Sequence, residues 1–197
     1  MTNKTIYMTG APAAGKSTLA TSLVRAFENV EVFEYGSRMS RWLSTKADTE
    51  NDVKQEELRS GTDHFVTRTD ICRINAEMDA WIHERSSYSH LIIDSHQVTI
   101  EEFGLIYEPF AKEELSALRI DEIWVIDVDP SIAIDRIARD PKGRTLPNEH
   151  TALMHSISQM SVATAYGAMK CVPVVVMDGG QDQDCIVRSA CHRLGLI

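Results

Sequence analysis

Near its start the chain carries the run Gly10-Ala11-Pro12-Ala13-Ala14-Gly15-Lys16-Ser17-Thr18, which satisfies the phosphate-loop pattern G-x-x-x-x-G-K-[ST] at every fixed position. In such a loop, glycines let successive backbone N–H groups face a β-phosphate, and the helix that follows adds a positive dipole end. The Lys16 amine would reach the β- and γ-phosphates, and the Ser17 hydroxyl would ligate Mg²⁺. The sequence therefore predicts a nucleoside triphosphate site whose ATP-binding residues are Gly10, Ala13, Ala14, Gly15, Lys16, Ser17 and Thr18.

The elements on either side of this loop favour that interpretation. Residues 5–9 are mostly apolar and indicate a buried strand, while Leu19, Leu23 and Phe27 recur at four-residue helical spacing. A strand, a glycine loop and a helix are the setting in which the motif binds phosphate. The alternative is a glycine-rich turn that merely caps a helix.

Composition indicates one compact enzyme domain. The chain has 197 residues, of which 43% are hydrophobic and 25% charged. Its formal net charge of -9 disfavours a broad surface for nucleic acid or anionic membrane. Four cysteines without a C-x-x-C pair suggest reduced, mostly buried thiols in a cytoplasmic protein. The first strand starts so early that we expect no signal peptide.

The remainder of the chain alternates apolar runs with helical patterns. Nearly continuous apolar strands separated by helices indicate a parallel sheet that is covered on both faces. The expected fold is a single α/β three-layer domain of residues 1–197. Its strands are expected at residues 5–9, 31–35, 90–94, 122–128 and 172–177.

Two aspartates end apolar runs and are candidates for a metal site. A phosphate-loop enzyme needs a carboxylate at the end of a neighbouring strand to hold the water shell of Mg²⁺. We predict that Asp94 has this role, together with Ser17, because Asp94 opens into an irregular segment that can line a site. An aspartate that caps a turn is the alternative for Asp94, and it is the preferred interpretation for Asp127 and Asp129.

Basic residues are sparse, so their grouping is informative. Arg136, Arg139, Lys142 and Arg144 lie close together, and Arg136 and Arg144 are predicted to stabilise the charge that develops during phosphoryl transfer. The alternative is a solvated basic helix end. A second set lies between the second and third strands, where it could bind an anionic acceptor: Arg38, Arg41, Arg59, Arg68 and Arg73. His96 could orient the acceptor, whereas the other histidines are expected at the surface or half-buried.

Several stretches in order resemble the archaeal-type adenylate kinases. They are GAPAAGKST, Tyr35-Gly36-Ser37-Arg38-Met39, Leu58-Arg59 with Arg68, Ile93-Asp94-Ser95-His96, the run from Arg136 to Leu146, and Ala163-Thr164-Ala165-Tyr166-Gly167. The resemblance implies a five-stranded P-loop kinase sheet of order 2-3-1-4-5, a helical acceptor-binding insertion at about 36–85 and a short lid at about 138–147. It further implies transfer of a phosphoryl group from ATP·Mg²⁺ to AMP, and a homotrimer.

By position, the resemblance places Gly36, Ser37, Arg59 and Arg68 in the acceptor pocket, and Arg136 and Arg144 in the lid. Met160 stands where the family is expected to have an arginine, the loop lacks the family's common internal glycine, and Arg38 and Arg41 are additional charges. A kinase for another small metabolite is therefore an open alternative. So is a regulatory protein that binds ATP without an acceptor.

Overall fold

The computed structural model describes residues 2–46, 66–101, 104–140 and 145–197. A five-stranded parallel sheet forms its centre, in the order β2-β3-β1-β6-β7, and a two-stranded antiparallel hairpin stands apart from it. The sheet strands are β1 (Thr5–Thr9), β2 (Val30–Glu34), β3 (His90–Asp94), β6 (Glu122–Asp127) and β7 (Val174–Asp178). Among the sheet strands alone, this order is 2-3-1-4-5, and the predicted α/β fold class is confirmed.

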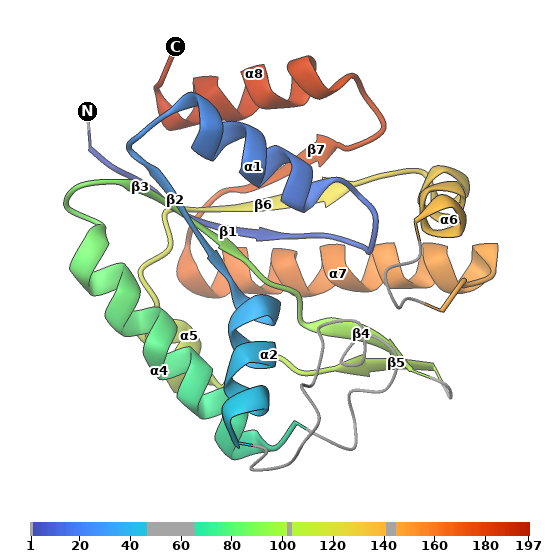
Figure 1. The fold of residues 1–197 in the computed structure, drawn as a ribbon, viewed down its shortest axis with the longest axis horizontal. Coiled ribbons are helices and arrows are strands. Elements are labelled where there is room, and N and C mark those ends of the chain that lie inside the picture. The colour runs from blue at the N-terminus through green and yellow to red at the C-terminus, as the bar shows by residue number, and fades with distance from the viewer. Residues whose placement is uncertain (1, 47–65, 102–103, 141–144) are drawn as a thin grey trace.

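Helices cover both faces of the sheet (Figure 1). One face packs on α1 (Lys16–Ala26) and α8 (Gln183–Leu194), through a core that includes Leu19, Leu23 and Ile186. The other face packs on four helices, through a second core that includes Ile74 and Tyr166. These helices are α2 (Tyr35–Lys46), α4 (Arg68–Arg85), α5 (Lys112–Ala117) and α7 (Glu149–Lys170), while α6 (Pro130–Arg139) lies beyond one end of the sheet.

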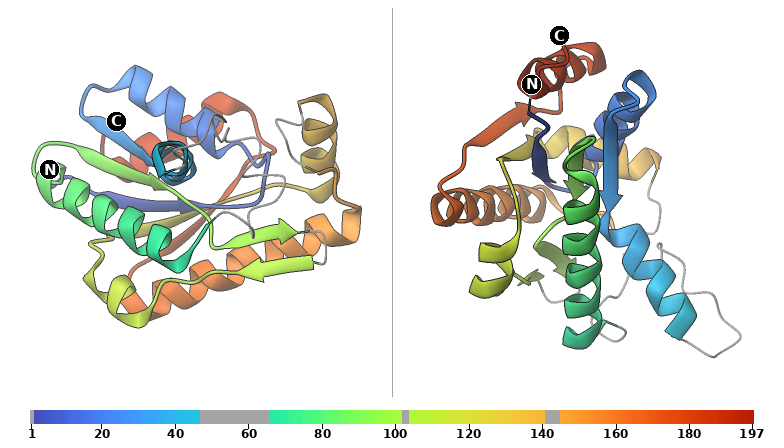
Figure 2. Two further views of the ribbon diagram at one scale, coloured as in Figure 1. Left: turned by 60° about the horizontal axis from the view of Figure 1, so that its bottom comes forward. Right: turned by 90° about the vertical axis from the view of Figure 1, so that its left-hand side faces the viewer.

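The hairpin was missed by the sequence prediction, which expected a less regular segment there. Strand β4 (Val98–Glu101) pairs antiparallel with β5 (Gly104–Tyr107), and the hairpin runs along α7 (Figure 2). Two buried side chains of α7 anchor it: His155 Nε2 and Gln159 Nε2 lie 2.8 Å and 2.9 Å from the carbonyl oxygen of Val98. This tertiary contact, rather than a strong strand pattern, holds the hairpin in place.

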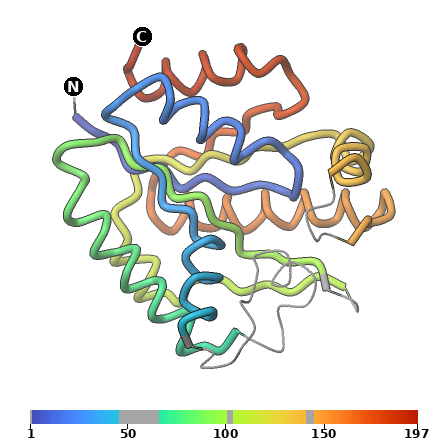
Figure 3. The backbone as a smooth tube through the Cα atoms, viewed as in Figure 1, coloured from blue at the N-terminus to red at the C-terminus, as the bar shows by residue number. Residues whose placement is uncertain are grey.

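The carboxyl ends of the parallel strands meet at one edge of the sheet. The register pairs Asp94 of β3 with Met8 of β1 on one side and with Glu34 of β2 on the other. The tube in Figure 3 shows the chain leaving β1 at this edge and turning back into α1. In open α/β sheets, ligands bind outside the carboxyl ends of the strands. The fold therefore brings the loop from Gly10 to Gly15 together with Asp94 and Glu34.

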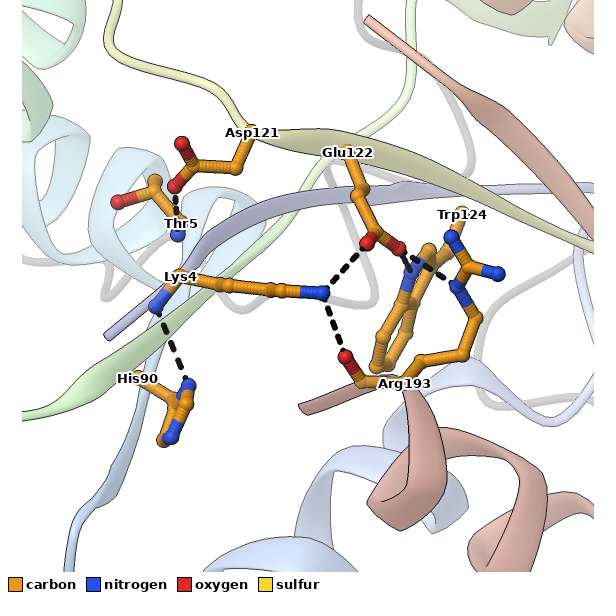
Figure 4. Close-up of polar contacts among 7 residues, drawn as sticks. All are labelled: Lys4, Thr5, His90, Asp121, Glu122, Trp124 and Arg193. Carbon is orange, nitrogen blue, oxygen red and sulfur yellow. Dashed lines mark hydrogen bonds and ion pairs between the residues drawn. The ribbon is translucent and has the colours of Figure 1, made fainter. Parts of the chain in front are cut away.

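The opposite end of the sheet is tied by a charged cluster around Glu122 (Figure 4). Glu122 is only 5% exposed and accepts hydrogen bonds from Lys4 Nζ at 2.7 Å, Arg193 Nε at 2.7 Å and Trp124 Nε1 at 3.0 Å. Lys4 also donates to the carbonyl oxygen of Arg193 at 2.6 Å. The cluster joins β1, β6 and α8, far from the phosphate loop.

Replacing Glu122 with glutamine is expected to lower the free energy of unfolding by about 2–3 kcal/mol, because two cations lose their buried partner. Burial works to raise the pKa of Glu122, but hydrogen bonds from Arg193, Lys4 and Trp124 and the charge of Arg193 lower it below its usual 4.5. A lowered carboxyl pKa contributes stability that is present above pH 4.5 and is lost as the pH falls further. Urea unfolding at pH 7 and below pH 4 measures the free energy of unfolding of the unmodified protein and of the Glu122→Gln variant. The difference between the two proteins should be smaller in acid than at pH 7. A difference that does not change with pH would contradict this account.

Two smaller expectations need correction. The thiols of Cys72, Cys171 and Cys185 are free and exposed, and only Cys191 is buried, so the cysteines are not mostly buried. His90 and His155 are also buried rather than superficial.

Asp129, as predicted, caps a helix: its carboxylate accepts from Ser131 N–H at the start of α6. Within the described ranges, no helix has both the length and the apolar character that a membrane span requires.

Candidate functional site

The loop from Gly10 to Gly15 has the backbone that the motif demands. Gly10 and Gly15 have φ angles of 145° and 104°, and a Cβ on Gly10 would stand 2.1 Å from the carbonyl oxygen of Ile126. Gly15 precedes α1, whose first turn carries no acidic side chain. The N–H groups of that turn therefore meet no local negative charge, which suits a phosphate at the helix N-terminus.

Lys16 lies over the loop itself. Its Nζ donates to the carbonyl oxygens of Gly10 at 2.6 Å and Ala11 at 3.0 Å. These bonds hold the ammonium group at the mouth of the loop, where a bound β- or γ-phosphate would compete with the carbonyls for it. Lys16 and the other predicted ATP-binding residues, Gly10, Ala13, Ala14, Gly15, Ser17 and Thr18, all line one cleft.

Arg136 of α6 fastens the loop to a second segment. Its guanidinium donates to the carbonyl oxygen of Ala13 at 3.1 Å and to that of Gly179 at 3.0 Å. Gly179 follows β7 and its N–H donates to the carbonyl oxygen of Asp127 at 2.6 Å. Arg136 thus lines the cleft beside the loop. Arg144, the other predicted lid arginine, lies outside the described residues.

The two predicted metal ligands lie in the same cleft. Ser17 stands in the first turn of α1, and half-buried Asp94 ends the neighbouring strand β3. Asp127 is engaged elsewhere, because its carboxylate accepts from the Ser156 hydroxyl. Among the described residues there is no group of three or more His, Cys, Asp or Glu side chains that could hold a metal alone. One hydroxyl and one carboxylate do fit Mg²⁺, which keeps several waters and takes its other oxygens from phosphates.

The cleft is large enough for two ligands. Its volume is about 1410 Å³, and it extends from the phosphate loop past Asp94 and His96 to α2, α4 and α5. We call the part near the loop and Arg136 the donor end. The acceptor end is the part lined by residues 34–37, 39, 66, 68, 71, 75, 108–110 and 114. Of the predicted acceptor residues, Gly36, Ser37, Arg68 and His96 line the cleft, and Arg59 falls outside the described residues.

Arg38 and Arg41 are not brought into this cleft. Both line a shallower groove of about 450 Å³ between α1 and α2, together with Arg25. Arg38 forms an ion pair with Glu77, and its guanidinium lies 4.3 Å from the centre of the Phe33 ring. These contacts engage the Arg38 guanidinium outside the set of residues that line the cleft. Arg73 stacks on Trp42, with its guanidinium carbon 3.8 Å from the ring centre.

The acceptor end is built by contacts between helices. The carboxylate of Asp70, buried in the first turn of α4, accepts from Trp42 Nε1 of α2 at 2.8 Å and from the Thr67 N–H at 2.9 Å. Asn75 of α4 donates to Glu114 of α5 at 3.2 Å. Together these bonds fix three helices around one end of the cleft.

Several residues that line the cleft were not predicted from the sequence. They come from the end of β2, the stretch around β4, and α5: Glu34, Gln97, Val98, Glu108, Phe110 and Glu114. The alternation of Val98 and Ile100, followed a few residues later by Gly104, was the available signal for the hairpin. Nothing in the local pattern could indicate that α5 turns Glu114 toward α4.

His155 of α7 was also missed. It lines the cleft while only 2% exposed, and it must donate from Nε2 because the Val98 carbonyl can only accept. Burial lowers the pKa of His155, the bond to Val98 opposes this, and the charge of Lys16 lowers the pKa further. We conclude that His155 is neutral at pH 7. Within the described chain its Nδ1 has no hydrogen-bond partner.

Comparisons with known proteins agree with the fold. A family model described as an AAA domain matches residues 9–152. A crystal structure of an unliganded sugar kinase from Janibacter sp. HTCC2649 is similar in fold, with a TM-score of 0.59 and 14% identity over 98% of this chain and 95% of that one. A search of curated proteins found no match for the sequence.

The family model covers well over half of the chain and begins at the phosphate loop. The match supports assignment to phosphate-loop proteins of kinase type. This group is broader than the archaeal-type adenylate kinases, which the sequence resembles. With its five-stranded parallel sheet and its phosphate loop, this chain belongs to the AAA domain family, within the superfamily of P-loop kinases.

Proposed function

We propose that this protein is a small-molecule kinase that transfers the γ-phosphoryl group of ATP·Mg²⁺ to an acceptor bound in the same cleft. The observation that carries the proposal is the continuity of the cleft, which joins the phosphate loop to a separate end walled by α2, α4 and α5. A protein that only binds ATP needs no second end. In phosphoryl transfer, positioning and charge stabilisation supply most of the catalysis, so a cleft that aligns two substrates is the main requirement.

At the donor end, each residue has a role that follows from its position. The N–H groups of the loop and the Lys16 ammonium would hold the β- and γ-phosphates, and Arg136 would add positive charge beside them. Ser17 and Asp94 would hold Mg²⁺, which would bridge the phosphates and neutralise developing charge. We propose that residues 138–147 act as a lid that carries Arg144, and that residues 36–85 form the acceptor-binding insertion of this single domain.

Two classes of acceptor are candidates. The first is a nucleoside monophosphate, with AMP foremost, as the resemblance to archaeal-type adenylate kinases implies. The second is an unphosphorylated metabolite that offers a hydroxyl. The sugar kinase with the similar fold fits the second class without deciding it.

We expect ADP release from ATP to rise at least tenfold when the right acceptor is present. The measurement is a coupled assay over AMP, CMP, UMP, GMP and a set of unphosphorylated alcohols and sugars, with Lys16→Ala as the background. ATP consumption that no acceptor changes would contradict the kinase function and would favour a regulatory ATP-binding protein.

A diadenosine polyphosphate separates the two classes of acceptor by binding alone. If AMP is the acceptor, this compound fills both ends of the cleft and should bind about 10² times more tightly than ATP or more, as two-substrate mimics do. If the acceptor is an unphosphorylated metabolite, the second adenosine gains nothing. Isothermal titration of both ligands gives the ratio directly.

A further inference from the structure

Helix α7 presents a row of buried polar side chains to its neighbours, and an inference from this row rests on the kinase function proposed above. His155, Ser158 and Gln159 are all buried and lie within about one turn of the helix. A buried amide or imidazole costs free energy unless it is hydrogen-bonded, whereas apolar side chains would pack there without that cost. Hydrogen bonds are also directional, so the partners of these side chains show which elements α7 holds in register.

Gln159 bridges the hairpin and the strand that leads into the phosphate loop. Its Nε2 donates to the carbonyl oxygen of Val98 at 2.9 Å, and its Oε1 accepts from the Thr9 hydroxyl at 3.1 Å. The Val98 carbonyl can only accept, so the orientation of the Gln159 amide is fixed. His155 Nε2 donates to the same oxygen at 2.8 Å, and the two bonds together use both lone pairs of that oxygen.

On the loop side, the bridge ends one residue before the phosphate loop. Thr9 is buried, is the last residue of β1 and directly precedes Gly10. The carbonyl oxygen of Gly10 accepts from Lys16 Nζ at 2.6 Å. A displacement of Thr9 would therefore shift the start of the loop, and with it the ammonium group that we assign to the donor phosphates.

On the hairpin side, the bridge ends at a strand that forms one wall of the cleft. The lining residues of β4 are Val98, Thr99 and Ile100. The N–H of Glu108, just after β5, donates to the carbonyl oxygen of Gln97 at 2.9 Å, which ties the lining segment 108–110 to the base of the hairpin. Tyr166, also in α7, accepts from the N–H of Phe110 at 2.7 Å. Helix α7 thus holds this wall near its first and its last residue (Figure 2).

We propose that Gln159 is a positioning residue for phosphoryl transfer, which fixes the distance between the phosphate loop and the hairpin wall of the cleft. Gln159 does not itself line the cleft, so it acts through Thr9 and Val98. Transfer requires the acceptor oxygen and the γ-phosphorus to be close and aligned, and a misplacement of about 1 Å can lower the rate about 10²-fold. The loss belongs to kcat, because each substrate keeps its own binding groups.

Gln159→Met tests this role, because it keeps the length of the side chain and removes both hydrogen bonds. We expect kcat with ATP·Mg²⁺ and the best acceptor of the panel above to fall about 10²-fold. The acceptor KM and the Kd of ATP should change less than threefold. Initial-rate kinetics and isothermal titration with ATP give these values, and thermal melting gives the folded fraction by which kcat is corrected.

Variants of Thr9 test the bridge from its other end, and they decide the matter even if Gln159→Met does not fold. Thr9→Val keeps the shape and removes the hydroxyl, so kcat should fall about tenfold, whereas Thr9→Ser should retain kcat within about twofold. In the Gln159→Met protein the bond is already absent, so adding Thr9→Val should lower kcat less than about twofold. The matched control is Thr164→Val, which should leave kcat unchanged. Thr164 is exposed on α7, and its hydroxyl donates to the carbonyl oxygen of Met160 in the same helix.

The outcomes separate the positioning role from the kinase function. If no compound raises ADP release above the Lys16→Ala background, both are overturned. If an acceptor is found but Gln159→Met retains kcat, raises KM alone, or loses activity only in proportion to its folded fraction, the positioning role alone is overturned. A Thr9→Val protein with unchanged kcat, or losses that multiply in the double variant, would overturn it as well.

Discussion

The Lys16→Ala variant is expected to lower kcat/KM for phosphoryl transfer by a factor on the order of 10³, because it removes the cation that we propose bridges the β- and γ-phosphates. The ammonium group already stands at the mouth of the loop, bonded to the carbonyl oxygens of Gly10 and Ala11. It therefore needs only a small movement to reach a phosphate, and no other described lysine lines the cleft. Initial-rate kinetics with the best acceptor give the ratio.

A matched control for this variant is Lys112→Ala. Lys112 is an exposed lysine at the start of α5 and does not line the cleft, so its loss should leave kcat/KM within about twofold, since solvated charges contribute little. Both variants should melt within a few degrees of the unmodified protein. A Lys16→Ala protein with unchanged transfer rates would place the phosphates elsewhere and contradict the donor site.

The second large effect is expected at Gly179, which is remote in sequence from the phosphate loop. A Cβ at this position would stand 2.1 Å from the carbonyl oxygen of Ala14 and 3.0 Å from Ile126 Cγ2. Because the first of these atoms is backbone of the loop itself, Gly179→Ala must displace the loop. We expect a loss of about 2–3 kcal/mol in stability from the overpacking. The displaced loop should also bind ATP more weakly, by roughly tenfold or more, because a tenfold loss of affinity requires a loss of only about 1.4 kcal/mol in binding free energy.

The neighbouring glycine provides the control. A Cβ on Gly180 would meet Asp178 Oδ1 at 3.0 Å and Ile132 Cδ1 at 3.4 Å, and both are side-chain ends that can move. Gly180→Ala should therefore retain ATP binding, as measured by isothermal titration, and most of the thermal stability. Equal behaviour of the two alanine variants would show that the contact between Gly179 and the loop is unimportant.

Much of the fold could be predicted because its signals are local. The five sheet strands are runs of apolar residues, and burial on both faces of a parallel sheet requires such runs. The strand and helix that flank the loop follow from the same short-range periodicity. The hairpin β4–β5 could not be found in this way, because β4 is stabilised by His155 and Gln159 of α7, which lie 57 and 61 residues after Val98.

Side-chain direction was the main source of the remaining differences. Arg38 and Arg41 are close in sequence to Gly36 and Ser37, which line the cleft, yet they face a different groove. On a helix, each position turns the side chain by about 100°, and here an ion pair with Glu77 and the ring of Phe33 hold Arg38 in that groove. Ser37 lies one turn before Arg41 and lines both the cleft and the groove.

The sequence by itself determined the donor half of this protein: the phosphate loop, its lysine, the helix that follows, and the sheet that carries them. This was possible because phosphate binding by backbone N–H groups depends on glycines at set spacings within one short segment. Only the tertiary structure decided the acceptor half. Its walls come from β2, α2, α4 and α5, which are far apart in sequence but close in space. Their packing brings Glu34, Arg68 and Glu114 to one end of the cleft. Which described side chains face that end follows from packing between elements.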